Sequence, residues 1–238
     1  MYKENPKLKG SGIQAAIPQV GSCPVGCPDC FFQNGRSYLE PLSENLPNMP
    51  EPQADRIVRV NDGNDSNVNR EQVIADTAKY PLRFFNTSSQ EDLEGYPGPV
   101  VLTLNPGARQ AWTKLKNIPP NLMFVRFLTN TWNMLVCDDA VEWYTDRQVT
   151  VVLTFMAYHS EDSIPLVFRE HYIKRARTTN TYWAITTAGW RMVMDQYTDN
   201  LWVHSCGKIE GEWGNTKCRH CGNCHREFFV TTERMSDV

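Results

Sequence analysis

The chain has 238 residues, 41% of them hydrophobic and 21% charged, which is typical of one globular domain or one domain with a small appendage. Its formal net charge of −3 excludes a strong general attraction to nucleic acid or to an anionic membrane. No apolar run approaches the roughly 18 residues of a membrane-spanning helix. The polar N-terminus MYKENPKLKGSG also lacks the apolar core of a secretory signal. We therefore expect a cytoplasmic protein with no membrane association.

The first two thirds of the chain alternates predicted strands with helices or crossovers. Helices are predicted over 66–80 and from Met134 to Tyr144, where apolar residues recur at helical spacing. Strands are predicted over 12–20, 55–60, 82–87, 99–107, 121–130 and 148–160. This alternation indicates a parallel α/β sheet, whose ligands bind at the carboxyl ends of the strands.

Polar residues follow most of these predicted strands. Loops face water, so polar residues there are common in any protein, and their recurrence favours a ligand site only modestly. The residues concerned are Asn61, Asp62, Asn86, Asn105, Asn130, Tyr158 and His159.

Seven of the eight cysteines occur in two groups. In a reducing compartment, clustered cysteines indicate metal ligands or catalytic groups rather than disulfides. Cys137 stands apart in a helical pattern, where we expect a small buried hydrophobic side chain. The first group is Cys23, Cys27 and Cys30, and the second is Cys206, Cys218, Cys221 and Cys224.

The first group, in CPVGCPDC (23–30), has the spacing C-x3-C-x2-C and follows the first predicted strand. This motif in this position resembles the signature of the radical SAM superfamily. The resemblance implies that Cys23, Cys27 and Cys30 bind a catalytic 4Fe-4S cluster and that S-adenosyl-L-methionine (SAM) binds the fourth iron. Reductive cleavage of SAM then yields a 5′-deoxyadenosyl radical, which abstracts hydrogen from a substrate. The alternative is a zinc site, which would need a fourth ligand from elsewhere in the chain.

The resemblance also implies where SAM binds. In the family, the turn after the second strand binds the amine, the ends of the fourth and fifth strands contact the ribose, and the sixth strand lies against adenine. Asp29 stands where the family often has an aromatic residue that touches adenine, and the second-strand turn lacks the family's usual Gly-Gly-Glu letters. The implied cofactor-binding residues are Asp62, Gly63, Asn64, Asp65, Thr103, Asn105, Asn130 and Met156.

The expected fold is a partial, open (β/α)6-type radical SAM barrel with a small cysteine-rich C-terminal extension. We expect the barrel in residues 1–165, a connecting basic and aromatic segment that packs on it in 166–200, and the cysteine-rich region in 201–238. An open barrel leaves a lateral mouth, which suits a large substrate such as a peptide, a protein or a polynucleotide.

The second cysteine group has the spacing C-x11-C-x2-C-x2-C. The tight run is typical of ferredoxin-like 4Fe-4S binding, with Cys206 as the remaining ligand. Four thiolates would close the cluster, so it would be an auxiliary centre that passes electrons or positions substrate. Zinc is the alternative, because Cys218-Arg-His-Cys221-Gly resembles a zinc knuckle, and His220 or His225 could replace a cysteine.

Radical SAM enzymes that modify peptides often carry such auxiliary clusters, so the pair of motifs favours a peptide or protein substrate, with flavodoxin or ferredoxin as electron donor. The basic segment FREHYIKRARTTN (168–180) is read as a solvated helix face, or else as a contact for an acidic substrate, an electron donor or nucleic acid. Two alternatives stay open: a nucleic-acid-modifying radical SAM enzyme, and a non-catalytic zinc-binding protein that contacts nucleic acid.

Overall fold

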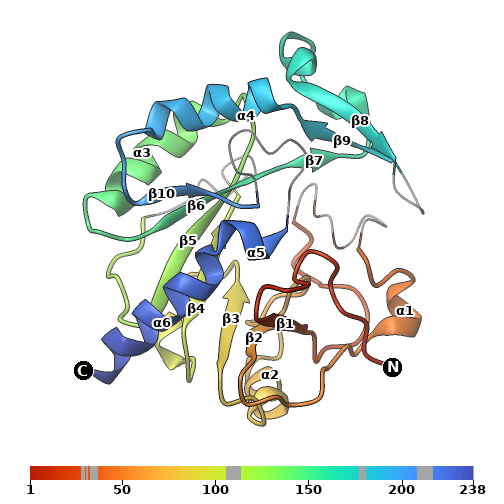
Figure 1. Cartoon of the computed structure of the whole chain (residues 1–238), viewed down its shortest axis with the longest axis vertical. Coiled ribbons are helices and arrows are strands. Elements are labelled where there is room, and N and C mark those ends of the chain that lie inside the picture. The colour runs from red at the N-terminus through yellow and green to blue at the C-terminus, as the bar shows by residue number, and fades with distance from the viewer. Residues whose placement is uncertain are drawn as a thin grey trace.

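A computed structural model describes residues 1–27, 30, 32, 37–105, 114–176, 181–207 and 217–237. Its centre is a seven-stranded parallel sheet in the order β1-β2-β3-β4-β5-β6-β10, curled into a half-barrel (Figure 1). The predicted α/β class with a curled parallel sheet is thereby confirmed. The strands are β1 (Ile13–Ala16), β2 (Ile57–Val60), β3 (Arg83–Thr87), β4 (Val100–Leu104), β5 (Leu122–Thr129), β6 (Val151–Phe155) and β10 (Val203–Ser205).

Three helices cover the convex face of the sheet: α2 (Arg70–Thr77), α3 (Met134–Thr145) and α4 (Thr187–Met194). Each contributes apolar side chains to one large core, among them Val73, the fully buried Cys137, and Val193. The outward-facing residues of the strands fill the other side of this core, and burial of this surface is the main favourable term in folding. Cys137 is therefore the buried apolar residue that its helical pattern predicts.

A small antiparallel sheet in the order β7-β9-β8 stands beyond the carboxyl end of β6. The predicted strand over 148–160 divides at Met156, with β6 in the main sheet and β7 (Ala157–Tyr158) in the small one. The predicted helix face in the basic segment is wrong for its described residues, which belong to the end of the 3-10 helix η3 (Leu166–His171) and to strand β8 (Tyr172–Ala176), paired with β9 (Thr181–Ile185). Residues 177–180 of the segment lie outside the described residues. Tyr172 explains the difference, since the strand lets its ring pack 5.8 Å from that of Tyr158.

Four short 3-10 helices and one short α-helix complete the connections between these elements. They are α1 (Leu42–Asn45), η1 (Leu93–Gly95), η2 (Glu161–Ser163), η3 (Leu166–His171) and η4 (Asp195–Tyr197). No described helix combines the length and the apolar character needed to cross a lipid bilayer.

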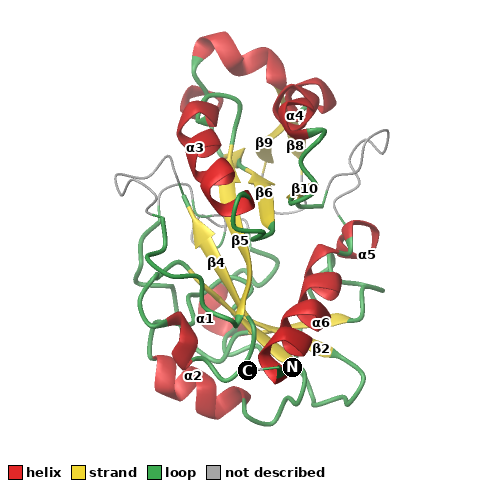
Figure 2. Cartoon of the chain, turned by 90° about the vertical axis from the view of Figure 1, so that its left-hand side faces the viewer, coloured by secondary structure: helices red, strands yellow, loops and turns green. Residues whose placement is uncertain are grey.

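The C-terminal residues are built into the half-barrel. Strand β10 pairs in parallel with β6, with Val203 beside Val151, and is the seventh strand of the sheet. Helices α5 (Cys218–Cys221) and α6 (Asn223–Ser236) follow it. Figure 2 shows α6 on the opposite side of the sheet from α2 and α3, which is the concave side. Helix α6 therefore covers the face at which an open lateral mouth was expected.

Helix α6 is fixed to the sheet along its length. The ring of Phe228 is only 3% exposed and lies 6.4 Å from the ring of Phe84 on β3. Glu227 is also buried and accepts a hydrogen bond of 3.1 Å from the Thr150 hydroxyl. Near the end of the helix, the Arg234 guanidinium donates to the carbonyl oxygens of Pro120 and Leu122. Both apolar packing and polar contacts thus hold α6 in the concavity.

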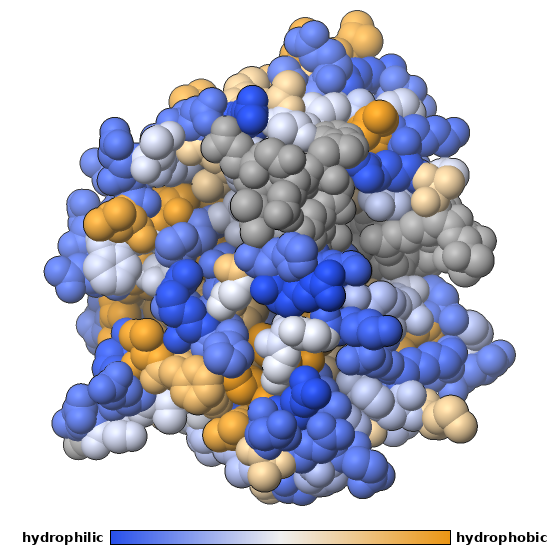
Figure 3. Space-filling model, in the orientation of Figure 1, coloured by the Kyte–Doolittle hydropathy of each residue, from blue (hydrophilic) through white to orange (hydrophobic). Residues whose placement is uncertain are grey.

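The outer side of α6 remains in contact with solvent. Phe229 and Val230 are 49% and 51% exposed. On the face drawn in Figure 3, hydrophobic side chains form separate patches among hydrophilic ones rather than one continuous surface. Single exposed apolar residues of this kind are normal on a folded protein.

We predict that Phe228→Ala lowers the free energy of unfolding by about 3–5 kcal/mol, because it leaves a cavity between α6 and the sheet. The matched control is Phe229→Ala, which removes the same ring from a half-exposed position and should cost about 1 kcal/mol or less. Chemical denaturation of the two variants measures both values. Equal losses would show that α6 does not pack in the concavity.

Candidate functional site

The loop of the first cysteine group begins just beyond the carboxyl end of β1. Cys23 is buried, while Cys27 and Cys30 are partly buried. Burial raises the pKa of the Cys23 thiol, and the backbone N–H groups of Val25 and Asp65 that face its sulfur lower it. Burial is also the main cause that raises the pKa of Cys27, and the charges of Cys30 and Cys23 raise it further. The charges of the three thiols therefore influence one another, and the Cys23 sulfur faces the backbone N–H of Asp65 in the turn that follows β2.

Phe32 joins the cysteine loop to that same turn. Its ring is 1% exposed and packs with Ile17 and Leu39. At Gly63, a Cβ atom would lie 2.1 Å from a carbon of the Phe32 ring, far inside van der Waals contact. Gly63 therefore has a packing reason to be glycine, which is separate from the role in SAM binding that the sequence predicts for it.

Both acidic residues of the turn after β2 already bind protein groups. The Asp65 carboxylate accepts hydrogen bonds from the N–H of Asn67 (2.8 Å), the hydroxyl of Thr87 (2.8 Å), and the N–H (2.7 Å) and hydroxyl (2.5 Å) of Ser88. Asp62 forms an ion pair with Arg59 and accepts from the side-chain amide of Asn5. These contacts give both acids structural roles, and their contact with SAM stays a prediction.

The neighbouring Asn64 is buried, and its side-chain oxygen accepts a 3.0 Å hydrogen bond from the Asp65 N–H. Asn130 follows β5 and is engaged in its own turn. Its side-chain oxygen accepts from the N–H groups of Trp132 (2.9 Å) and Asn133 (2.8 Å), and its amide donates to the Tyr158 hydroxyl (2.9 Å). A ribose contact from Asn130 would use the second N–H of its side-chain amide or replace one of these bonds.

The remaining predicted SAM contacts lie near the ends of β4 and β6. Thr103 and Asn105 are partly buried at the carboxyl end of β4. Met156 is partly buried between β6 and β7, and its N–H donates to the Thr129 carbonyl (2.9 Å). The sheet thus brings the predicted residues to one end of the half-barrel, although several of their polar groups already have partners.

The side chains that point into the half-barrel form two layers, because alternate residues of a strand face the same side. The layer toward the amino ends of the strands is apolar and packs against α6. It contains Ile13, Ile57, Phe84, Val101, Phe124 and Val152. The inward-facing residues two positions further along β2 to β6 are polar. These residues, called the polar layer here, are Arg59, Asn86, Thr103, Arg126 and Thr154, and the registers set Arg59 beside Phe84, Asn86 beside Val101 and Arg126 beside Val152.

The two arginines of the polar layer were missed by the sequence predictions. Arg59 is 9% exposed and ion-paired with Asp62. Arg126 donates from Nη1 to the Asn86 side-chain oxygen at 3.3 Å, and its buried Nε has no acceptor among the described residues. A usable signal was present, because each is a single charged residue inside an otherwise apolar strand, IVRV and LMFVRFLT.

The second cysteine group faces these arginines. Cys206 follows β10, and Cys206, Cys218 and Cys224 all pack against the inward-facing core. Burial raises the pKa of Cys218 to about 12, although the positive charge of Arg59 lowers it. The pKa of Cys224 is also raised by burial and lowered by Arg126 and Arg59. The charges of Cys206 and Cys221 also raise the pKa of both thiols, by less than burial does.

Neither cysteine group is arranged as a finished metal site. In the parts of the chain that the structure describes, no three His, Cys, Asp or Glu side chains form a group that could hold a metal ion. Metal binding would require the loops to draw the gathered sulfurs closer together. Soft thiolate donors suit iron–sulfur clusters and zinc alike. Asp29, between two of the cysteines, and residues 208–216, between Cys206 and Cys218, lie outside the described residues.

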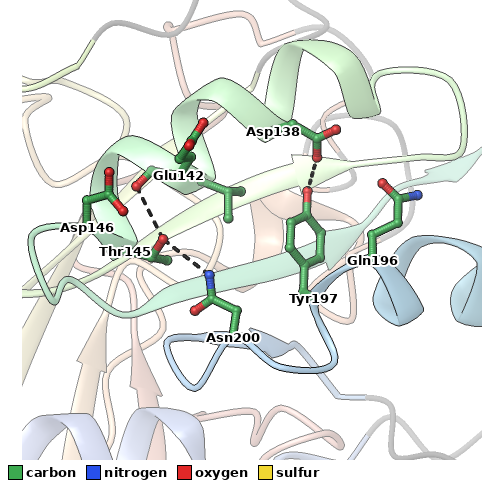
Figure 4. Close-up of a pocket in the computed structure, with 8 residues that line it drawn as sticks. Asp138, Glu142, Thr145, Asp146, Gln196, Tyr197 and Asn200 are labelled. Carbon is green, nitrogen blue, oxygen red and sulfur yellow. Dashed lines mark hydrogen bonds between the residues drawn. The ribbon is translucent and has the colours of Figure 1, made fainter.

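A pocket of about 310 Å³ lies on the outer layer, between α3 and the segment around η4 (Figure 4). Asp138 and Glu142 line it from α3, Asp146 lines it from just after that helix, and the Tyr197 hydroxyl donates to Asp138. Burial, and next the contact with Asp138, raise the pKa of Tyr197, so its hydroxyl stays protonated and can donate. These polar groups attach the η4 segment to α3, and we assign them a structural role.

We predict that Gly63→Ala destabilises the protein by about 1–3 kcal/mol, because the added methyl group overlaps the Phe32 ring. Trimming that ring in the double variant Gly63→Ala/Phe32→Leu should recover part of the loss. The double-mutant cycle, measured by denaturation, isolates the contact. Additive effects of the two substitutions would contradict the packing of the cysteine loop on the β2 turn.

Comparison of the chain with protein-family models, with curated proteins and with solved structures found no match. Its function must therefore be inferred from its own residues. The features that bear most on function are the two groups of cysteines. One group follows the first strand of the curled parallel sheet, and the other packs on its concave face near two arginines.

Proposed function

We propose that this chain is a radical SAM enzyme whose catalytic 4Fe-4S cluster is bound by Cys23, Cys27 and Cys30. The observation that carries the proposal is the place of the C-x3-C-x2-C loop. It follows β1 of a curled parallel sheet and contacts the turn after β2. In parallel α/β sheets this end of the strands is where ligands bind. Three thiolates would leave the fourth iron free to bind SAM.

When bound and reduced, such a cluster supplies the electron that cleaves SAM into methionine and a 5′-deoxyadenosyl radical. The chain's own residues bind and orient the reactants. Burial raises the pKa of Cys23 and so opposes its thiolate, the form that ligates metal, while the N–H groups of Val25 and Asp65 that face its sulfur offset part of this effect.

Two buried polar atoms near the carboxyl ends of the strands support a polar ligand at this site. The side-chain oxygen of Asn61, directly after β2, has no hydrogen-bond partner in the described part of the chain. The hydroxyl oxygen of Thr154, in the inner layer of β6, has none either. Buried polar atoms are normally hydrogen-bonded. The amine, carboxylate and ribose of SAM offer the donors and acceptors that these positions need.

A peptide or protein is the proposed substrate, and flavodoxin or ferredoxin the proposed electron donor. Because α6 covers the concave face, substrate would approach from the carboxyl end, where the small antiparallel sheet stands. The outer edge of β8 pairs with no strand among the described residues, and Ile173 and Lys174 on it are exposed. A strand at the edge of a sheet can bind an extended peptide by strand addition, which supports this substrate class.

The test of the catalytic cluster is a paired measurement of iron and of SAM cleavage in anaerobically reconstituted protein. Two cubanes predict about eight irons per chain. The variant Cys23→Ala/Cys27→Ala/Cys30→Ala should retain about four irons and form no 5′-deoxyadenosine with dithionite and SAM. Cys137→Ala is the matched control and should retain iron and cleavage, because Cys137 is buried in the core of the convex face. A triple variant that still forms 5′-deoxyadenosine would refute the assignment, as would wild-type protein that binds only zinc.

A second test concerns the auxiliary centre. We predict that Cys206→Ser lowers iron toward the share of the catalytic cluster, because Cys206 is the proposed fourth ligand of the second group. Cleavage of SAM without substrate should survive, while product formation should be lost. If iron were fully retained, Cys206 would not be a ligand. The partly buried His204 on β10, whose pKa is lowered mainly by burial, would then be a candidate in its place.

A further inference from the structure

Arg126 is an inward-pointing cation with no acidic partner among the described residues. It projects from β5 into the half-barrel, and its guanidinium carbon lies 5.6 Å from the centre of the Phe124 ring. Its one hydrogen-bond acceptor in the described part of the chain is the neutral side-chain oxygen of Asn86, at 3.3 Å. A partly buried guanidinium of this kind is costly unless an anion compensates its charge. The polar layer therefore offers a positive charge to a ligand.

One edge of this guanidinium is open. Its Nε is buried without an acceptor, and its Nη2 donates to none of the described residues. Nε and Nη2 are the two neighbouring donors from which a carboxylate can accept with both of its oxygens. Asn86 holds the remaining nitrogen, Nη1, and its own amide is fixed by donating to the Val60 carbonyl at 3.0 Å. The two open donors are thus oriented before any ligand binds.

The burial of the inward-facing residues falls along β5. Phe124 is fully buried in the apolar layer under α6. Arg126 and Leu128, the next two inward positions, are only partly buried, and Leu128 belongs to none of the apolar cores that the described residues form. The register sets the partly buried Thr103 of β4 beside Arg126. Arg126 therefore lies at the boundary between the packed apolar layer and the carboxyl-end part of the concave face, from which substrate would approach.

The charge of the polar layer matches a ligand group with one negative charge. Arg59, the other arginine of the layer, forms an ion pair with Asp62, so these two residues together are close to neutral. Arg126 therefore supplies most of the net positive charge. A carboxylate balances that charge, whereas a phosphate, with nearly two negative charges, exceeds it.

We propose that Arg126 binds the carboxylate of an aspartate or glutamate side chain of the substrate, so that the substrate is an acidic peptide segment. The inference deepens the proposed function and rests on it for the peptide as substrate. The carboxylate of SAM has the same chemistry and is the other source of such an anion. Its amine, attached to the same carbon atom, is predicted at the turn after β2, three strands away from β5 in the sheet. This separation favours the carboxylate of the substrate.

The test is peptide binding to the full-length chain, measured by isothermal titration calorimetry at constant ionic strength. The probes are a capped pentapeptide with one glutamate between glycines and its counterpart with glutamine. The parent chain should bind the glutamate peptide at least about tenfold more tightly, because losing hydrogen bonds between charged groups costs roughly that factor. Arg126→Gln should abolish the preference. The matched control Arg147→Gln should retain it, because Arg147 is an exposed residue after α3 that lies over Trp143.

A second variant keeps the proposal testable if Arg126→Gln misfolds. Asn86→Asp retains Arg126 and gives it a carboxylate partner within the chain, so this variant should also lose the preference. Equal or unmeasurable binding of the two peptides to the parent chain would overturn the proposal. A preference that survives in either variant, with the fold intact by circular dichroism, would overturn it too.

Two further measurements separate this inference from the proposed function. The SAM affinity of the reconstituted enzyme, measured without peptide, should be unchanged by Arg126→Gln. A weaker affinity would assign Arg126 to the SAM carboxylate and overturn the proposal. Peptide binding needs no iron, so a chain that prefers the glutamate peptide but forms no 5′-deoxyadenosine would refute the proposed function alone. A chain that cleaves SAM but shows no such preference would refute the role of Arg126 alone.

Discussion

The structure depends on filling the concave face of a curled sheet. The layer of that face toward the amino ends of the strands is apolar, so it must be covered by other apolar groups. Helix α6 supplies them through Phe228 and Cys224. Because α6 runs along this layer, α5 and the start of α6 reach the level of the polar layer. The position of the second cysteine group therefore follows from packing that would exist without any metal.

The polar layer gives that position its chemical character. Burial opposes ionisation of the thiols, while the neighbouring guanidiniums favour it, and burial is the larger effect for Cys218 and Cys224 in the metal-free chain. The environment of the second cysteine group therefore resists free thiolates.

The strand pattern of the first 155 residues could be predicted because most of the buried parallel strands are largely apolar runs, as in β4 and β6. Partners far apart in sequence were not predictable in the same way. Asp65 looks like a free acid in a loop until the fold brings Thr87 and Ser88 to it. Helix α6 was not predicted, although its buried Cys224, Phe228 and Thr231 recur at helical spacing.

The two ends of the chain meet at the second cysteine group. The Lys7 carbonyl binds the Cys218 N–H, Gly10 lies against the side chain of Arg219, and Gly12 lies against that of His225. During synthesis on a ribosome, the first dozen residues must therefore wait for the last twenty before this part of the molecule can form. Such a high sequence separation slows folding and leaves the concave face of the sheet uncovered until residues 217–237 have been synthesised. The nascent half-barrel would then expose apolar surface of the kind that chaperones bind.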